Sequence, residues 1–198
     1  ELKDHIVGLN AGRWDYLFSY QKVYRNTKKV ILPDRSKVDM FMPFMSNYNK
    51  LLVDTCHKRG AFGMGGMSAQ VIAKSNPPEI NEKALNGVKK DKGRELDQGN
   101  DGAWVAHPSL VEPVKNIFEK NFDGPNQMKK FNNIKVNRRD LLDEPKIERA
   151  ITENGVRENL QEGIEYLAYW IGGTGASVVN YLMADVATCE VSRAQLWV

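Results

Sequence analysis

Short apolar segments alternate with amphipathic segments along the first 120 residues of the chain. Short apolar runs bounded by Gly are typical of buried strands, and apolar residues at every third or fourth position are typical of helices packed on a core. Regular alternation of the two is typical of an α/β fold with parallel strands. The pattern predicts strands at residues 6–10, 61–70 and 103–106, and helices at residues 48–60, 81–98 and 110–122.

The pattern changes near Asp123, where a Gly-Pro pair and the polar, basic residues 127–139 interrupt the alternation. Such a stretch is typical of a linker between domains. Beyond it the periodicity is helical: Thr152 is placed to cap a helix that Gly residues would end, and residues 181–197 predict another helix. We expect an α/β segment at 1–125, a linker at 126–150 and a helical segment at 151–198.

Composition adds that this is an ordinary globular chain. Of its 198 residues, 41% are hydrophobic and 27% are charged, which excludes disordered, collagen-like and disulfide-stapled classes. The formal charge of +3 comes from basic residues interspersed with acids, so nucleic acid is not expected as a partner. A mildly basic surface suits a small anionic metabolite or a phosphorylated cofactor.

The two cysteines and the chain ends bear on compartment and completeness. Cys56 and Cys189 have no CxxC spacing, so neither a disulfide framework nor a zinc site is expected, and a reducing compartment is the simpler interpretation. No apolar run approaches the roughly 20 residues that span a bilayer, so no membrane is expected. The first residues do not form a signal peptide and lack an initiator Met, and both ends are apolar. We expect a piece of a longer protein.

Two Gly-rich stretches invite comparison with phosphate-binding loops. Residues 63–66 lack the GxxxxGK[ST] pattern, and residues 172–175 lack the GxGxxG spacing. Close packing of backbone explains the first stretch, and the end of a helix explains the second. Neither stretch predicts a nucleotide site.

Asp15 is a candidate metal ligand. It follows a short predicted strand and a Gly turn, and carboxylates at the carboxyl ends of strands are where α/β barrels assemble their sites. Mg²⁺ prefers one or two carboxylates together with water and substrate oxygens. A salt bridge to Arg13, or a role in starting a helix, would explain Asp15 equally well.

Asp185 is a candidate base because it stands among apolar residues. Loss of solvation makes an ionised carboxylate a stronger proton acceptor, although an Asp in this position is more often a helix cap. His57 lies at a helix end, where the helix dipole explains it, and His107 lies at a strand end as a weak site candidate. Cys189 is expected to be a packed core thiol rather than a nucleophile.

Six segments, taken together and in order, closely resemble the sequences of one enzyme family. That family is malate synthase of the A type, the glyoxylate-cycle enzyme, and the resemblance covers essentially the whole chain. The segments are GLNAGRWDYLFSY (8–20), LPDR (32–35), TCHKRGAFGMGGMSAQ (55–70), DGAWVAHPSLV (101–111), GPNQ (124–127) and MADVATCEVSRAQLW (183–197).

The resemblance implies a TIM (β/α)₈ barrel followed by a helical C-terminal domain. Residues 1–125 would form the second half of the barrel, and residues 151–198 the start of the helical domain. It also implies an acyltransferase that converts acetyl-CoA, glyoxylate and water to malate and CoA with Mg²⁺. Relatives of this kind are cytoplasmic or peroxisomal, including glyoxysomal.

Several residues receive roles from the resemblance alone. Asp15 in the GRWD motif is implied as a metal ligand, and Asp185 as the general base that removes a proton from the acetyl methyl group. The backbone of the first strand end is implied to lie near glyoxylate, and further residues to line the channel for the thioester and pantetheine arm. The residues implied to lie near glyoxylate are Leu9, Asn10 and Gly12. The residues implied to line the channel are Met64, Trp104, Ala106 and Pro108.

Two departures from the family pattern matter. Ala184 stands where the family has an acidic residue directly before the base. The contacts that orient the Asp185 carboxylate are therefore expected to differ from those in the family. The family's other metal-binding Glu and its glyoxylate-binding Arg lie upstream of the GRWD motif, so the catalytic site is incomplete in these residues. A TIM barrel needs about 250 residues, which again indicates a fragment.

Two alternatives to an active malate synthase remain at this stage. The departures are compatible with a truncated or diverged chain that keeps the fold and acts only by associating with a partner. A citrate lyase β-type enzyme, another CoA-ester lyase on a related barrel, is less favoured because it lacks the GRWDY and SRAQ wording. The sequence leaves the oligomeric state open.

Overall fold

The computed structural model describes residues 2, 4–27, 31–142 and 150–197. The chain divides into two compact units, and each takes two separate stretches of the sequence. The first unit comprises Glu1–Gly12 and Pro43–Asp143, and the second comprises Arg13–Met42 and Glu144–Val198.

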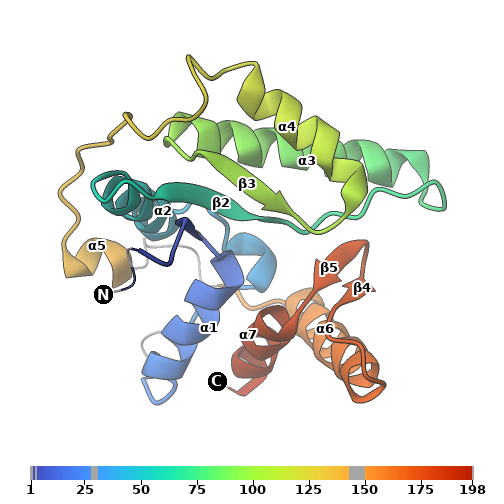
Figure 1. Ribbon diagram of the computed structural model, residues 1–198. Helices are drawn as coiled ribbons and strands as arrows, with labels where there is room; N and C mark the ends of the chain where they lie inside the picture. Colours follow the sequence, from blue (N-terminus) through green and yellow to red (C-terminus); the bar gives the residue numbers. More distant parts are fainter. Residues whose placement is uncertain (1, 3, 28–30, 143–149, 198) are drawn as a thin grey trace. The chain divides into compact units, whose positions relative to one another are not determined.

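The first unit is an α/β structure and the second is mainly helical (Figure 1). The elements of the first unit are β1 (Gly8–Asn10), α2 (Pro43–His57), β2 (Phe62–Ser68), α3 (Pro78–Asp97), β3 (Gly102–Val105), the 3₁₀ helix η2 (Pro108–Leu110), α4 (Val111–Glu119) and α5 (Arg138–Leu142). Those of the second unit are α1 (Arg13–Tyr24), the 3₁₀ helix η1 (Arg35–Lys37), α6 (Glu153–Ile171), β4 (Ser177–Val179), β5 (Leu182–Ala184) and α7 (Val186–Trp197).

A parallel sheet with the order β1-β2-β3 forms the first unit. Asn10 pairs with Met64 across the first ladder, and Met67 pairs with Trp104 across the second. Parallel neighbours require a crossover, which α3 supplies between β2 and β3. α3 and α4 pack side by side over these strands (Figure 1). The predicted α/β fold with parallel strands is confirmed, and so are the three strands and three helices predicted for this region.

The glycines at 63–66 allow other groups to approach β2 closely. A Cβ on Gly63 would lie 3.0 Å from the Cα of Val53 in α2. A Cβ on Gly66 would lie 2.7 Å from the carbonyl oxygen of Ala11. The interpretation of this stretch as close backbone packing is therefore confirmed.

A buried ion pair from α3 supports an irregularity in β2. The register against β3 shifts between Met64 and Met67, which is typical of a β-bulge whose backbone groups lose ladder partners. The Lys92 ammonium donates to the carbonyl oxygen of Gly66 at 2.8 Å, and the Gly66 N–H donates to Glu95 Oε1 at 3.1 Å. Lys92 Nζ and Glu95 Oε1 are 2.9 Å apart, and both side chains are almost fully buried. The pair thus satisfies the backbone groups that the bulge leaves open.

The stability of the first unit should depend on pH through Glu95. Burial raises the pKa of this carboxyl to about 7, against the lowering effect of Lys92 and Arg94 and with a further increase from Asp91. Because the pKa in the folded state exceeds that of the unfolded chain, the stabilising contribution is complete below about 4.5 and is lost as pH rises through about 7.

The test is the free energy of unfolding of the wild type minus that of Glu95→Gln, measured from pH 5 to 8. We expect this difference to fall as pH rises. Glu119→Gln removes an exposed carboxylate of α4 and serves as the control, for which the difference should stay flat. A flat profile for Glu95→Gln would contradict the prediction.

A polar network fastens the amino-terminal ends of β2 and β3. Asp101 accepts hydrogen bonds from the backbone N–H groups of Gly63 (2.9 Å) and Gln127 (2.8 Å). Its Oδ2 lies 2.9 Å from His57 Nε2, while His57 Nδ1 lies 2.7 Å from the carbonyl oxygen of Lys130. His57 therefore lies in the last turn of α2, as predicted, and its ring is held there by a carboxylate and a carbonyl that the helix-dipole explanation did not include.

The same network fixes the start of the segment predicted as a linker. Gln127 also donates from its side chain to the carbonyl oxygens of Leu96 and Asn100. α5 lies within the predicted linker. Residues 143–149 of that linker are outside the described residues. The division at 126–150 stays a prediction.

The second unit contains α6, whose amino terminus is capped as predicted. The Thr152 hydroxyl accepts a hydrogen bond from the Gly155 N–H at 3.0 Å. Asp34 in turn accepts from the backbone N–H and the hydroxyl of Thr152 at 3.0 and 2.7 Å. A carboxylate at a helix amino terminus is favoured by the helix dipole. α6 ends at Ile171 with Gly172 as its C-cap, and Gly173 has a φ of +91°, so the predicted helix end is also confirmed.

The prediction of one helix over 181–197 was wrong at its start. β4 and β5 form an antiparallel hairpin whose two connecting residues, Asn180 and Tyr181, have φ values of +49° and +64°. Positive φ at both central residues is the geometry of a tight hairpin turn, which the periodicity does not reveal. α7 begins only after Asp185.

Apart from Tyr166, the residues that α6 buries are small or polar rather than apolar. Within the unit its buried positions are Gly155, Asn159, Glu162 and Tyr166, which repeat at helical spacing. The apolar residues on the other positions are exposed, with Ile164 at 66%. The periodicity therefore predicted the helix correctly, although most of its apolar residues are exposed within this unit. α1 was not predicted.

Candidate functional site

The end of β1 brings three of the proposed substrate-binding residues together. Leu9 and Asn10 are exposed, and Gly12 ends the unit's first stretch. The backbone continues the ladder for one residue, because the Ala11 N–H donates to the carbonyl oxygen of Met64 at 3.0 Å. This places the 9–12 backbone at the carboxyl end of the strand, the end at which barrels of this type build sites.

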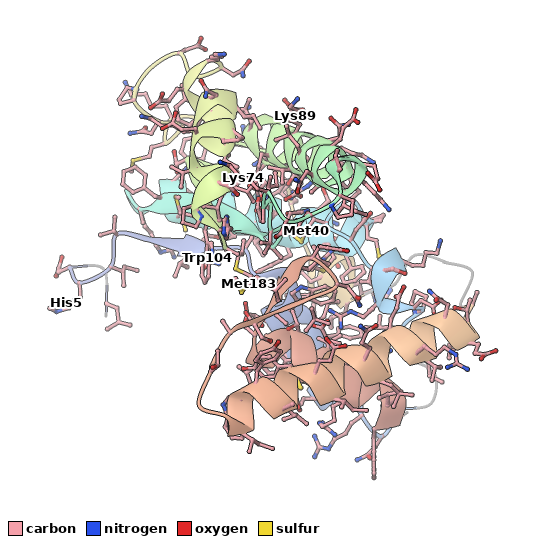
Figure 2. The ribbon with its side chains drawn as sticks, turned by 90° about the vertical axis from the view of Figure 1, so that its right-hand side faces the viewer. His5, Met40, Lys74, Lys89, Trp104 and Met183 are labelled. Carbon is pink, nitrogen blue, oxygen red and sulfur yellow. The ribbon has the colours of Figure 1, made fainter. Side chains whose placement is uncertain are left out.

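The end of β3 lies at the same edge of the sheet. The Ala106 N–H donates to the carbonyl oxygen of Ser68, the last residue of β2, at 3.0 Å. Trp104 is 49% exposed on β3 (Figure 2). Pro108 begins η2, which His107 caps by accepting from the Ser109 N–H at 3.2 Å. The structure therefore gathers 104–108 beside the end of β2 and assigns His107 a local capping role.

Met64 occupies a different place from these residues. It pairs with Gly102 at the start of β3. A Cβ on Gly102 would lie 3.0 Å from the methyl carbon of Met64. It lines an open, mainly apolar cavity of about 590 Å³ between β3 and α4. Met64 thus contacts the amino-terminal half of β3, while Ala106 and Pro108 follow its carboxyl end.

Ser68 is a feature that the sequence reasoning missed. Ser68 is 3% exposed, and its hydroxyl has no hydrogen-bond partner among the residues that the structure describes. A buried polar atom without a partner is costly, and such atoms are concentrated where a ligand or water completes the site. Ser68 belongs to the MSAQ segment at 67–70, but no local sequence pattern shows that a buried hydroxyl lacks a hydrogen-bond partner.

In the second unit, the two candidate carboxylates lie close enough to interact. Asp15 is in the first turn of α1, and Asp185 stands directly before α7, which packs against α1. Burial raises the pKa of Asp15, and the negative charge of Asp185 raises it further. The fold thus brings together two acids that are 170 residues apart in the sequence.

Asp185 is the N-cap of α7. Its Oδ1 accepts from the Thr188 N–H at 3.0 Å, and its own N–H donates to Thr188 Oγ1 at 2.9 Å. This reciprocal pairing is a capping box with Thr in the place of Glu. Within the described part of the chain, Oδ2 makes no hydrogen bond. The cap interpretation is confirmed, and it leaves one carboxylate oxygen available for chemistry.

The donor set fits a hard divalent cation only in part. Partial burial is the main cause of the raised pKa of Asp15, and the negative charge of Asp185 adds to it, a repulsion that a cation would relieve. Mg²⁺ is satisfied by one or two carboxylates with water and substrate oxygens. Among the described residues, no group of three His, Cys, Asp or Glu side chains could hold a metal alone. The chain therefore offers a partial ligand set that suits Mg²⁺.

Three further polar residues surround the Asp185 cap, and sequence reasoning gave them no role. Arg35 Nη1 donates to Ser192 Oγ at 2.6 Å and lies 3.7 Å from Glu162 Oε2. The hydroxyl of Thr188, which completes the cap, donates to the carbonyl oxygen of Asp185 at 2.7 Å. The polar stripe of α6 was the available signal, because it places Glu162 at the spacing of buried positions.

Comparison with known families decides the affiliation of the chain. Residues 1–144 match the family described as "Malate synthase, TIM barrel domain", and residues 150–198 match "Malate synthase, C-terminal". The chain belongs to the malate synthase family. Its α/β unit accordingly holds part of a TIM barrel, as the resemblance implied, and its last segment belongs to the C-terminal region of that family.

Individual malate synthases are similar along the whole chain. The malate synthase of Myxococcus xanthus (strain DK1622) is 44% identical over 198 residues, and the glyoxysomal malate synthase of Candida tropicalis is 48% identical over 200 residues. The "Bifunctional glyoxylate cycle protein" of Caenorhabditis elegans is 46% identical over 197 residues. All of this chain aligns with the first two, but it spans only 36% of the length of each, and 20% of the third.

Two smaller expectations about the chain can also be assessed. Cys56 and Cys189 are free and buried, and burial raises the pKa of both thiols, which agrees with a packed core role for Cys189. In the described segments, no helix has the length and apolar character needed to cross a membrane.

Proposed function

We propose that the protein to which this chain belongs is a malate synthase, which condenses acetyl-CoA with glyoxylate and hydrolyses the product to malate and CoA. The observation that carries the proposal is that α1 packs against α7, which brings Asp15 and Asp185 into one unit from opposite ends of the sequence. The names of its relatives support the reaction class. The compartment that we propose is cytoplasmic or glyoxysomal, since several relatives carry the latter word in their names.

Asp185 acts as the general base in this proposal. The methyl group of a thioester is a weak acid, so its proton must pass to a well-placed carboxylate. Oδ1 is held by the Thr188 N–H, which leaves Oδ2 to take the proton. The carbanion then attacks the aldehyde carbon of glyoxylate, and water hydrolyses the thioester to release CoA.

Asp15 would hold Mg²⁺ together with ligands from the remainder of the protein. When bound, the ion polarises the aldehyde of glyoxylate as a Lewis acid. The backbone at Leu9, Asn10 and Gly12 would contact glyoxylate. Met64, Trp104, Ala106 and Pro108 would line the path of the thioester arm. Exposure of Trp104 and the open cavity beside Met64 are compatible with these contacts.

A chain that keeps the fold without catalysis is the second candidate. The observation in its favour is that Ala184, a buried methyl side chain, gives Asp185 no hydrogen-bonding support from the preceding position. Such a protein would bind a partner but release no CoA.

The deciding experiment measures free CoA thiol released from acetyl-CoA by the full-length protein. We expect release that requires both glyoxylate and Mg²⁺, and we expect chelation of the metal to abolish it. Addition of Mg²⁺ after chelation should restore the rate, which separates metal loss from unfolding. Absence of release from folded, full-length protein in the presence of Mg²⁺ would favour the non-catalytic candidate.

A further inference from the structure

A cavity within the second unit has no part in the proposed reaction. It is lined by residues of α1, α6 and α7 and by residues 31–34, and it is partly open to solvent. Its volume is about 80 Å³, which accommodates about two or three water molecules or one small organic molecule of the same size. None of the residues proposed for catalysis or substrate binding lines it.

One residue that lines the cavity has an amide oxygen without a donor. The Gln195 side-chain N–H donates to the carbonyl oxygen of Pro33 at 2.8 Å, which fixes the orientation of that amide. Gln195 Oε1 accepts from Asn159 Nδ2 at 2.9 Å, which fixes the Asn159 amide in turn. Asn159 Oδ1 is then left buried, with no donor among the residues that the structure describes. Exchanging O and N in either amide would break this relay, so the unpaired acceptor is a real feature of the fold.

A second amide oxygen without a donor comes from another helix. Gln21 on α1 also lines the cavity, and no described residue donates to its buried Oε1. Gln21 is 9% exposed and Asn159 is 5% exposed. A buried acceptor without a donor is costly, and a ligand or an ordered water commonly completes it. Two such oxygens around one cavity indicate an occupant that donates at least two hydrogen bonds.

The charge and shape of the cavity restrict what it can hold. Each oxygen of Asp34 accepts one hydrogen bond from Thr152, and an ionised carboxylate has about four acceptor sites. Among the described residues that line the cavity there is no Lys, Arg or His, so an anion would find no cation to offset its loss of solvation. Most of the remaining wall is apolar, including Leu32, Val156 and Leu196. The occupant is therefore neutral or cationic and has a short apolar body.

We propose that this cavity binds a small primary aliphatic amine in its protonated form, which donates to Gln21, Asn159 and Asp34. An alkylammonium group has three donors, as many as there are acceptor groups, and it is charged at neutral pH as the lysine side chain is. An alcohol has one donor and no charge, and a carboxylate has no donor. The inference goes beyond the proposed function and does not depend on it.

The test is a titration of the full-length protein with isobutylamine, followed by ligand-observed NMR. A probe of about five non-hydrogen atoms is expected to bind with a Kd on the order of 1 mM. Isobutanol and isobutyrate keep the apolar body and change the polar group. We expect isobutanol to bind at least about tenfold more weakly, because it lacks the charge and two of the donors, and isobutyrate to show no saturable binding.

Two variants each remove one acceptor from the cavity. Gln21→Met and Asn159→Leu should each weaken isobutylamine binding by about tenfold or more. Gln161→Met is the control, because Gln161 is an exposed residue of α6 that does not line the cavity, and it should leave the Kd unchanged. Asn159→Leu also breaks the contact with Gln195. Gln21→Met breaks no described side-chain hydrogen bond, so it should unfold at the wild-type urea midpoint and still bind more weakly.

Three results would overturn the inference. The first is saturable isobutylamine binding that neither Gln21→Met nor Asn159→Leu weakens. The second is binding of isobutanol as tight as that of isobutylamine. The third is a crystal structure of the full-length protein in which ordered waters donate to both amide oxygens and stay in place after a soak in isobutylamine. Binding as expected in a protein that releases no CoA would refute the proposed function alone and support the amine site.

Discussion

Replacing Asp185 with Asn in the full-length protein should lower the rate of glyoxylate-dependent CoA release by about 10²- to 10⁴-fold, the usual contribution of a general base. The amide cannot accept the acetyl proton. Asn is nevertheless as good an N-cap as Asp, so its side-chain oxygen can keep the hydrogen bond from the Thr188 N–H. The variant should therefore be folded and inactive. The measurement is the initial rate of thiol release at saturating substrates and Mg²⁺.

The control for this variant is Asp39→Asn. Asp39 also accepts a backbone hydrogen bond, from the Phe41 N–H at 2.9 Å, but it lies in an exposed turn. Its replacement should leave the rate unchanged. If Asp185→Asn kept activity within about tenfold of the wild type, Asp185 would not be the base, and another carboxylate would have to be sought.

The second large effect concerns stability and the ion pair beneath β2. Lys92→Met should lower the free energy of unfolding by about 3–5 kcal/mol at pH 8, because it leaves the buried Glu95 carboxylate without its cation. It also removes the donor to the Gly66 carbonyl oxygen. The choice of pH matters because the pKa of Glu95 is about 7, so this carboxyl is mostly ionised at pH 8.

Urea unfolding of the full-length protein measures this effect as a shift of the midpoint. Lys89→Met is the matched control, since Lys89 is an exposed lysine on α3, one turn before Lys92 (Figure 2). It should change stability by no more than about 0.5 kcal/mol. Adding Glu95→Gln to Lys92→Met should recover part of the loss. A loss no larger than that of Lys89→Met would show that the pair contributes little.

The sequence by itself determined the α/β character of the first unit and most of its elements. Strands and helices alternate there with strong local periodicity, and Gly and Thr mark the ends of α6, so short-range patterns were sufficient. The six motifs, read together, also indicated the family. The functional roles of Asp15 and Asp185 came from that resemblance and remain proposals.

Local patterns failed where partners are distant in sequence. The β4–β5 hairpin depends on positive φ at Asn180 and Tyr181, neither of which is Gly, so periodicity gave no sign of the turn. His57 finds its partners at Asp101 and Lys130, and a helix-end pattern could not show them. In each case the missing information was a backbone conformation or a contact across the fold.

Only the tertiary structure decided how the acids are arranged. Asp185 caps α7, yet it retains one oxygen within reach of chemistry and lies close enough to Asp15 to raise the pKa of that carboxyl. The α6 stripe that contains Glu162 is buried although it is polar, because Arg35 from another segment neutralises it. A sequence specifies each helix through its neighbours along the chain, but the burial of a charge depends on a partner that only folding brings near.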